Sequence, residues 1–406
     1  MSEVSKIPFI IATKDNLPLF AAVSPVGRCQ RAVEKIEISA EKEIEMVKYE
    51  DLAEKFKEIK RKTVVVFADY ILDDMSLEIA ADKVYGNIGS DETAFLTYNS
   101  KTAPIFVAGE NVFEKLSAAD FQNAENPAEA VEEFCRKNEG ITVSCHEVER
   151  AFWAKLTDKK SAKAAQWGLL QHLQFRPGGL VAKYINRPFS MRISRVLVNF
   201  ASITPNFVTV FASLLALVAV AMFCQPGHFW AIMAAIMIHI NSVLDDVDGE
   251  IARVRKMESS FGAWLDSICD ETLGVFIYIA IGYHLFITPP SYIAANPDFK
   301  YTFLIIGIFT AVASYTYALT HWHCKIKHGL GFYFWWECYK PRKEVQRSTS
   351  IFSYVKKLFW KESILLMVVF AAIFDFLDIF LIFTCIPAAV NLLLIFIHIF
   401  IKRARW

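Results

Sequence analysis

The chain has 406 residues, enough for more than one domain, and 54% of them are hydrophobic. Its formal net charge is zero, so nothing in the charge balance suggests nucleic acid as a partner. Residues up to about 174 are mixed and charge-bearing, whereas long apolar segments dominate beyond about residue 199. This change of composition predicts a membrane protein that carries a water-soluble head.

Strand-like and helix-like stretches alternate in the first part of the chain. Short buried strands are predicted at residues 8–13, 64–67, 93–98 and 105–108, and helical charge patterns occupy residues 40–60 and 127–137. Alternation of this kind indicates an α/β sandwich with a largely parallel sheet. We therefore expect residues 1–160 to form a cytoplasmic α/β domain.

Residues 161–200 are predicted to be a linker followed by a juxtamembrane helix. The linker helix covers residues 161–175, and residues 180–198 form an amphipathic basic helix along the cytoplasmic membrane surface. Lys183 and Arg187 on this helix are expected to contact lipid headgroups. For Arg192 and Arg195, headgroup contact and binding of an anionic substrate both remain open.

Residues 201–406 are predicted to be an all-α transmembrane domain. Each of six apolar segments approaches the length of about 20 residues that a spanning helix needs. These segments are residues 206–224, 228–247, 261–288, 301–320, 362–381 and 383–401. The connections on one side of this arrangement carry nearly all the lysines and arginines, which places both termini on the cytoplasmic side of a cell inner membrane.

Four carboxylates lie at the edges of these apolar segments or inside them. Asp245 and Asp248 are three residues apart, and Asp266 and Asp270 are four apart, so each pair shares one face of a helix. Ionised carboxylates in such segments are costly and usually functional. Oxygen ligands favour hard divalent cations, with Mg²⁺ expected and Mn²⁺ or Ca²⁺ as alternatives. A metal site of this kind suits phosphoryl transfer, whereas the alternative is that the acids only cap helices and carry solvated charge.

The same residues resemble the CDP-alcohol phosphotransferase (CDP-alcohol phosphatidyltransferase) family. Its signature runs D-x-x-D-G-x-x-A-R, eight residues, then G-x-x-x-D-x-x-x-D, and every fixed position is present between Asp245 and Asp270. The resemblance implies transfer of a substituted phosphate group from a CDP-linked donor to an alcohol acceptor, with release of CMP, in phospholipid or inositol-phosphodiester biosynthesis. It implies an enzyme of the EC 2.7.8 type that works in a membrane and is often a homodimer.

The resemblance also assigns roles to individual residues. The four aspartates would hold two divalent cations, and Asp270 would be the general base that takes the proton of the acceptor hydroxyl. The nucleotide would contact the following residues: Asn206, Asp248, Gly249, Ala252, Arg253 and Gly262. Glu271 follows the last aspartate of the signature and is expected at the acceptor site, where Arg192 and Arg195 would join it if they bind the anionic substrate rather than lipid headgroups.

Within the family, the layout looks most like di-myo-inositol-phosphate-phosphate synthases and phosphatidylinositol-phosphate synthases. Members that take a phosphorylated inositol usually have an arginine where this chain has Glu271. A carboxylate beside a phosphate is unfavourable, so an unphosphorylated or amine-bearing alcohol is expected to fit better.

The first 160 residues resemble a degenerate nucleotidyltransferase domain. Residues 24–36 are similar to the segment after that family's nucleotide loop, and residues 64–69 fall where its metal-binding aspartate strand lies. Residues 13–16 replace the glycine-rich loop, so a regulatory or structural role is expected rather than catalysis. Asp69, Asp73 and Asp74 are accordingly expected to be turn and surface acids.

Two other classes of function are alternatives to a transferase. An ion-coupled transporter would use the intramembrane acids, but its acids would be spread over several helices and its sequence would show inverted repeats. A non-catalytic membrane scaffold would not need the complete signature.

Overall fold

The computed structural model describes residues 6–36, 41–117, 124–174, 179–296, 299–328 and 360–401, and the side chains of all of these except residues 321–328 and 398–401. The chain divides into two compact units. The first contains residues 1–175, 195–202 and 251–257, and the second contains residues 176–194, 203–250 and 258–406.

A six-stranded mixed sheet forms the centre of the first unit. Its strand order is β2-β1-β3-β6-β5-β7. The strands are β1 (Lys6–Thr13), β2 (Glu41–Lys48), β3 (Thr63–Phe67), β5 (Glu92–Tyr98), β6 (Lys101–Ala108) and β7 (Thr142–Glu147). β1 pairs in parallel with β2 and β3, and β7 with β5, whereas β6 runs antiparallel to both of its neighbours. A separate two-stranded sheet joins β4 (Tyr70–Leu72) to β8 (Trp153–Lys155).

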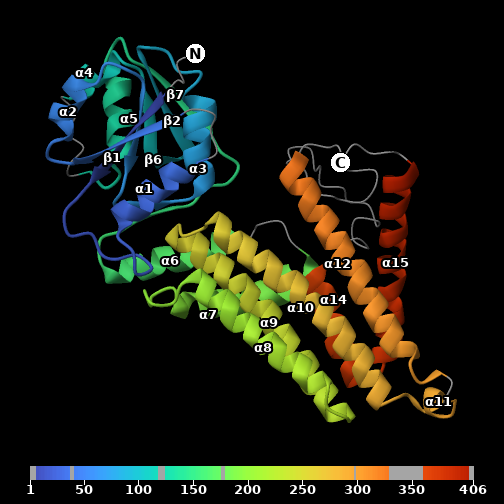
Figure 1. Cartoon of the computed structure of the whole chain (residues 1–406). Helices are drawn as coiled ribbons and strands as arrows, with labels where there is room; N and C mark the ends of the chain where they lie inside the picture. The colour runs from blue at the N-terminus through green and yellow to red at the C-terminus, as the bar shows by residue number, and fades with distance from the viewer. Residues whose placement is uncertain are drawn as a thin grey trace. The chain divides into compact units, whose positions relative to one another are not determined.

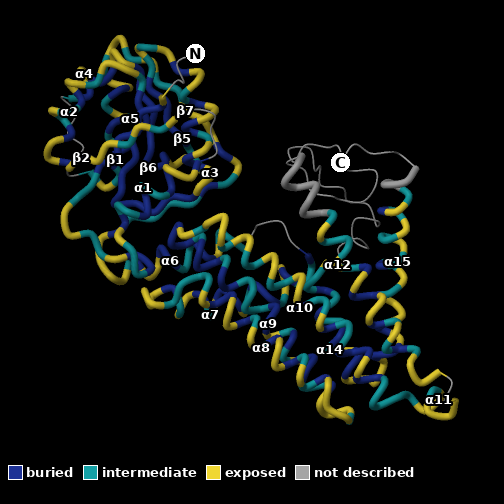
Figure 2. The backbone as a smooth tube through the Cα atoms, in the orientation of Figure 1, coloured by how far each residue is buried: buried dark blue, intermediate teal, exposed yellow. Residues whose placement is uncertain are grey.

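Helices cover both faces of the large sheet, because alternate residues of its strands are apolar on each face. Phe9 and Val64 pack in the same core as α1 (Pro25–Lys35), α3 (Asp74–Glu78) and the π-helical segment Ile79–Val84. Ile10 and Val65 pack on the other face, with α2 (Leu52–Glu58), α4 (Val112–Leu116) and α5 (Pro127–Lys137). This α/β sandwich is visible in Figure 1, and Figure 2 shows its strands as the buried centre.

The predicted strands and the helix at 127–137 are confirmed, and the predicted helix at 40–60 is wrong in its first half. Residues 41–48 form β2, and only residues 52–58 are helical. β2 is an edge strand with mostly exposed side chains, and charged residues are tolerated at the edge of a sheet. The charge pattern of this segment therefore did not distinguish a solvated strand from a solvated helix.

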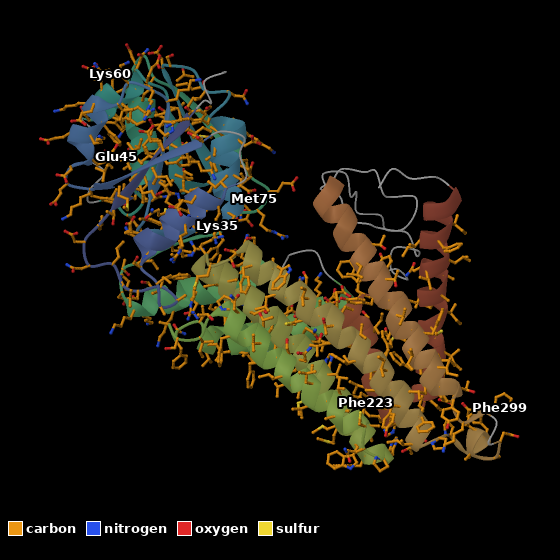
Figure 3. The ribbon with its side chains drawn as sticks, in the orientation of Figure 1. Lys35, Glu45, Lys60, Met75, Phe223 and Phe299 are labelled. Carbon is orange, nitrogen blue, oxygen red and sulfur yellow. The ribbon has the colours of Figure 1, made fainter. Side chains whose placement is uncertain are left out.

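The last residues of the long helix α9 (His228–Arg255) belong to the first unit, where basic side chains of α1 bind their carbonyls. Arg28 Nε donates to the carbonyl of Val254 at 2.8 Å, and Lys35 Nζ donates to that of Lys256 at 3.0 Å. Lys35 is labelled on α1 in Figure 3. Lys256 has a φ of 57°, and Met257 N–H donates to the carbonyl of Ala252, which is the left-handed ending common at helix C-termini. Cations are favourable at such an end, so α1 stabilises the terminus of α9.

The first unit also includes α6 (Lys159–Leu173), which confirms the predicted linker helix. Asp158 accepts a hydrogen bond from Ser161 N–H at 2.7 Å, and the Ser161 side chain accepts one from the Asp158 N–H, so a capping box begins the helix.

The second unit is helical. It contains the π-helical turn Ala182–Asn186, α7 (Arg187–Leu197), α8 (Pro205–Phe223), α9, α10 (Ser260–Ile287), α11 (Ser291–Ala294), α12 (Thr302–His328), α14 (Lys361–Ile373) and α15 (Leu377–Ile401). Five of the described helices, α8, α9, α10, α12 and α15, are long and apolar enough to cross a membrane. Thr204 caps α8 by accepting the N–H of Phe207 at 3.2 Å, and Pro205 occupies the first turn.

Two predicted helix boundaries in this unit are wrong. The second apolar helix does not end at residue 247 but continues to Arg255, so Asp245 and Asp248 both lie within α9. The fifth segment, 362–381, is broken: α14 ends at Ile373, Asp375 has a φ of 61°, and α15 begins at Leu377. Average hydropathy did not reveal this break, because Asp375 is flanked by long apolar stretches on both sides.

Two glycines allow α10 and α12 to pack closely. A Cβ on Gly282 of α10 would lie 2.7 Å from the carbonyl oxygen of Phe303 and 3.2 Å from Gly307 Cα. Small residues that let backbones approach are typical of membrane helix pairs. We expect Gly282→Ala to lower the free energy of unfolding by roughly 1–3 kcal/mol through overpacking. Gly274→Ala in the same helix is the control, since a Cβ there has no neighbour within 4 Å. Equal melting temperatures of the two variants in detergent would contradict this account.

Candidate functional site

Three of the four predicted metal ligands come together between α9 and α10. Asp245, Asp248 and Asp266 each offer a carboxylate oxygen, and these oxygens lie within 4.8 Å of one another. Asp245 and Asp248 share a face of α9 because they are one helical turn apart. Three carboxylates at this separation repel one another unless cations neutralise them.

Asp270, the fourth predicted ligand, is connected to this group by a lysine. Lys361, the first residue of α14, donates to Asp245 Oδ2 at 3.1 Å and also forms an ion pair with Asp270 Oδ2. Asp245, Asp270 and Lys361 all remain partly exposed, so the group is open to its surroundings. Sequence reasoning missed Lys361, because a lysine at the end of an apolar segment usually extends to the membrane interface and is no signal of function by itself.

The chemistry of the acids fits divalent cations. Asp266 Oδ1 is buried and receives no hydrogen bond from the described part of the chain. Asp248 is buried, and its Oδ2 accepts a hydrogen bond from the hydroxyl of Thr209 on α8. Thr209 was not predicted, although it lies one turn after Pro205 on the helix that carries Asn206. A set of hard oxygen ligands with an unsatisfied oxygen is suited to Mg²⁺, Mn²⁺ or Ca²⁺.

Two of the predicted nucleotide-binding residues are neighbours. Asn206 lies in the first turn of α8 and Gly262 in the first turn of α10, and a Cβ on Gly262 would lie 3.1 Å from Asn206 Oδ1. The Gly262 N–H donates to Ser259 Oγ at 3.0 Å, which caps α10. Gly262 therefore leaves room beside the Asn206 amide. The other predicted nucleotide residues, Gly249, Ala252 and Arg253, follow Asp248 along α9.

A buried polar seam joins α7 to α9 beside the acids. Glu250 accepts hydrogen bonds from the hydroxyls of Ser190 at 2.7 Å and Ser194 at 2.6 Å, and all three side chains are buried. Asn186 Nδ2 donates to Ser242 Oγ at 3.0 Å. The seam was not predicted, although serines four residues apart on a basic helix mark a polar face. It fixes the juxtamembrane helix to the helix that bears the motif.

Arg187 corrects one prediction for this helix. It was expected to contact lipid headgroups, but it is buried and interacts electrostatically with Asp246. A guanidinium in a polar seam balances neighbouring carboxylates, so its position follows from the acids of α9 rather than from lipid.

The three predicted acceptor residues are exposed. Arg192 donates to the carbonyl of Pro188 at 3.1 Å and lies over the ring of Phe189. Arg195 belongs to the first unit, where its guanidinium lies 5.0 Å from the ring centroid of Trp167. Glu271 directly follows Asp270 on α10 and interacts electrostatically with it. Of the three, Glu271 is thus the residue that has an interaction with a predicted metal ligand among the described residues.

In the first unit, Asp69 and Asp73 are buried, so the prediction that they are surface acids is wrong. Asp69 is 1% exposed, and its Oδ1 accepts a hydrogen bond from the hydroxyl of Tyr49. Burial raises the pKa of Asp69, and the hydrogen bond from Tyr49 opposes this shift. Asp73 Oδ2 lies 3.3 Å from His172 Nε2, and Asp74 pairs with Lys256. These acids contact protein groups.

Comparison with known proteins gives the following relationships. Residues 202–336 match the model of the family described as CDP-alcohol phosphatidyltransferase. A protein of Aquifex aeolicus named "Bifunctional IPC transferase and DIPP synthase" is 30% identical over 246 residues, which are 56% of this chain and 56% of that protein. A protein of Archaeoglobus fulgidus with the same name is 32% identical over 136 residues, 33% of this chain and 26% of that protein.

A shorter similarity concerns a "Phosphatidylinositol phosphate synthase" of Mycobacteroides abscessus. It is 38% identical over 72 residues, which are 18% of this chain and 31% of that protein. The chain therefore spans about half, or less, of the length of the relatives that it matches.

Proposed function

We propose that this chain, whose residues 202–336 match the CDP-alcohol phosphatidyltransferase family, belongs to that family and transfers a substituted phosphate group from a CDP-linked donor to an alcohol acceptor with release of CMP. The convergence of Asp245, Asp248 and Asp266 within 4.8 Å is the observation that carries the proposal. A transporter would be expected to spread its acids over several helices, whereas these acids gather on two.

Each group of the site has a part in the proposed reaction. Asp245, Asp248, Asp266 and Asp270 would hold two divalent cations, which would neutralise the carboxylates and bind phosphate oxygens. Asp270 accepts the proton of the acceptor hydroxyl. It is suited to this role because its side chain is partly exposed and it is next to Glu271, which is assigned to the acceptor. The acceptor oxygen attacks the β-phosphate, the bond to the CMP phosphate breaks, and a phosphodiester remains.

The nucleotide is proposed to lie between the start of α8 and α10. The Asn206 amide beside Gly262 supports this position, since an amide can donate and accept hydrogen bonds at a base edge. Gly249 and Ala252 present little side-chain bulk on α9, which allows a ligand to approach the helix. Arg253 would order the acids or the phosphate groups.

The chain is an integral membrane protein, and its orientation is part of the proposal. We propose six spans, with α14 in place of the broken segment 362–381, and we place both termini and the acids on the cytoplasmic side, with the site open to the cytoplasm and to membrane lipid. A homodimer is proposed from the family resemblance. Five of the proposed spans are supported by described helices of sufficient length and hydropathy.

The first unit is proposed to be regulatory or structural. Two relatives are named bifunctional, but in this chain residues 13–16 do not supply a glycine-rich loop. Asp69, at the end of β3, is buried and bound by Tyr49, which supports a non-catalytic role.

The decisive experiment measures CMP release by the purified chain in detergent. CDP-diacylglycerol and CDP-alcohols serve as donors, and a panel of alcohols serves as acceptors, each with Mg²⁺ and with excess chelator. CMP release that needs both the acceptor and Mg²⁺ is expected. Folded protein that releases no CMP with any donor would favour the scaffold or transporter alternatives.

The acceptor is proposed to be an unphosphorylated or amine-bearing alcohol, because Glu271 stands beside Asp270. A phosphorylated inositol should be a poor acceptor, and Glu271→Arg should raise kcat/KM for it by about tenfold or more, as expected for a new charge pair. Glu271→Gln separates loss of repulsion from gain of attraction. Equal use of phosphorylated and unphosphorylated inositol by the unmodified chain would refute this assignment.

A further inference from the structure

We propose that Lys361 is a positioning residue that competes with a divalent cation for Asp245 and Asp270. This inference rests on the proposed function but concerns the state of the site before cations and donor bind. The ammonium contacts two of the four predicted ligands, and they come from different helices, α9 and α10. No other residue type could supply a mobile positive charge there as compactly as lysine does.

The charge of the cluster explains why such a residue is needed. Four carboxylates on two helices would push α9 and α10 apart in the absence of a cation. One ammonium joins Asp245 to Asp270 and so holds the two helices in the spacing that Asp248 and Asp266 also share. Lys361 is therefore placed to keep the site assembled while it is empty of metal.

The position of Lys361 also allows it to leave. It is the first residue of α14, and its side chain is 38% exposed, so its four-carbon stem can swing without moving the helix. A divalent cation on Asp245 and Asp270 would repel the ammonium. An anionic phosphate of the donor would be a favourable partner for the displaced ammonium.

The proposal predicts a direct effect on metal affinity. Lys361→Met keeps the length of the side chain and removes its charge, so Mn²⁺ should bind at least about tenfold more tightly, the effect expected for loss of a close competing charge. Without metal, this variant should melt at a lower temperature than the unmodified chain. Added Mn²⁺ should remove this difference in melting temperature. Lys361→Arg keeps the charge and should bind Mn²⁺ nearly as the unmodified chain does.

The experiment titrates the full-length protein in detergent with Mn²⁺ alone and measures free Mn²⁺ by electron paramagnetic resonance, with melting temperatures in parallel. Lys300→Met is the matched control, because Lys300 lies over the ring of Phe286. Phe286 is 16 residues beyond Asp270 on α10, which is about 24 Å at the helical rise. Mn²⁺ affinity that is unchanged or weaker in Lys361→Met would overturn the proposal, as would an unmodified chain that binds no Mn²⁺.

Because no donor is present, the outcome is independent of CMP release. A chain that shows the competition but releases no CMP would retain this inference and lose the proposed function. A chain that releases CMP, while Lys361→Met binds Mn²⁺ no more tightly, would retain the function and lose the inference.

Discussion

Asp270→Asn is expected to reduce the rate of CMP release by about 100- to 10,000-fold, the usual contribution of a general base. Asparagine has nearly the same shape as aspartate but cannot accept the acceptor's proton, and it is a weaker ligand for a hard cation. The side chain of Asp270 is 23% exposed and contacts Lys361, so it can meet an alcohol from outside the cluster. The measurement is single-turnover CMP release at saturating Mg²⁺, which reports the chemical step.

Asp375→Asn is the control for this loss. Asp375 is 86% exposed and pairs with His228, the first residue of α9. Asp245 lies 17 residues further along that helix, or about 25 Å at the helical rise. Unchanged CMP release by Asp375→Asn and a large loss in Asp270→Asn are expected together. An Asp270→Asn variant that retains more than about a tenth of the rate would remove Asp270 from the role of base.

The acids could be predicted from the sequence because helical periodicity is local. Residues three or four apart share a face, so the pairs at 245 and 248 and at 266 and 270 needed no knowledge of the fold. Their approach to one another depends on the packing of α9 against α10. Only the family signature suggested that approach in advance, and the structure brings Asp245, Asp248 and Asp266 within 4.8 Å.

Residues that reach the site from distant parts of the chain could not be predicted in this way. Lys361 is 91 positions beyond Asp270, and Thr209 lies on a different helix from the acid that it contacts. Arg187 was read as a headgroup contact, because an arginine on an amphipathic helix has the same sequence pattern whether it faces lipid or a buried seam. Tertiary contacts decide between these alternatives, and the periodicity of the sequence does not reveal which tertiary contacts form.

The fold shows the same division between local and distant information. The strand at 63–67 is buried on both faces and reads as a continuous apolar run, so it was predicted correctly. β2 pairs only with β1 and keeps its charged residues in solvent, so its sequence resembled a helix. The break between α14 and α15 depends on the left-handed backbone conformation of Asp375. Aspartate adopts this conformation more often than most residues, but the sequence does not show where it will do so.

Arg255→Ala is the second variant for which a large effect is expected, in this case on stability. Arg255 is 1% exposed, and it ends α9 within the first unit. Its Nε donates to the carbonyl of Ala21 at 2.9 Å, and one of its terminal nitrogens donates to those of Val198 at 2.6 Å and Phe200 at 2.7 Å. Two of these carbonyls follow the end of α7, where a cation is favourable. The guanidinium therefore ties three separate segments of the first unit together.

Removing this side chain takes the donor from the buried carbonyls of Ala21 and Val198, and each buried unsatisfied group costs about 1–3 kcal/mol. Arg255→Ala should therefore lose about 2 kcal/mol or more of stability. Hydrogen–deuterium exchange of the full-length protein should show faster exchange around residues 19–23 and 195–202. Arg255→Lys, which can satisfy fewer carbonyls, should be intermediate.

The control for this prediction is Arg136→Ala. Arg136 is 55% exposed and pairs with Glu132 one helical turn away, a kind of contact worth less than about 1 kcal/mol. If Arg255→Ala exchanged no faster than Arg136→Ala, the guanidinium would not be what holds these segments, and the contacts of Arg28 and Lys35 with the end of α9 would have to suffice. Faster hydrogen–deuterium exchange in Arg255→Ala, but not in Arg136→Ala, would instead show that Arg255 anchors the end of α9. From the sequence alone, Arg255 is only a positive charge at the edge of an apolar segment.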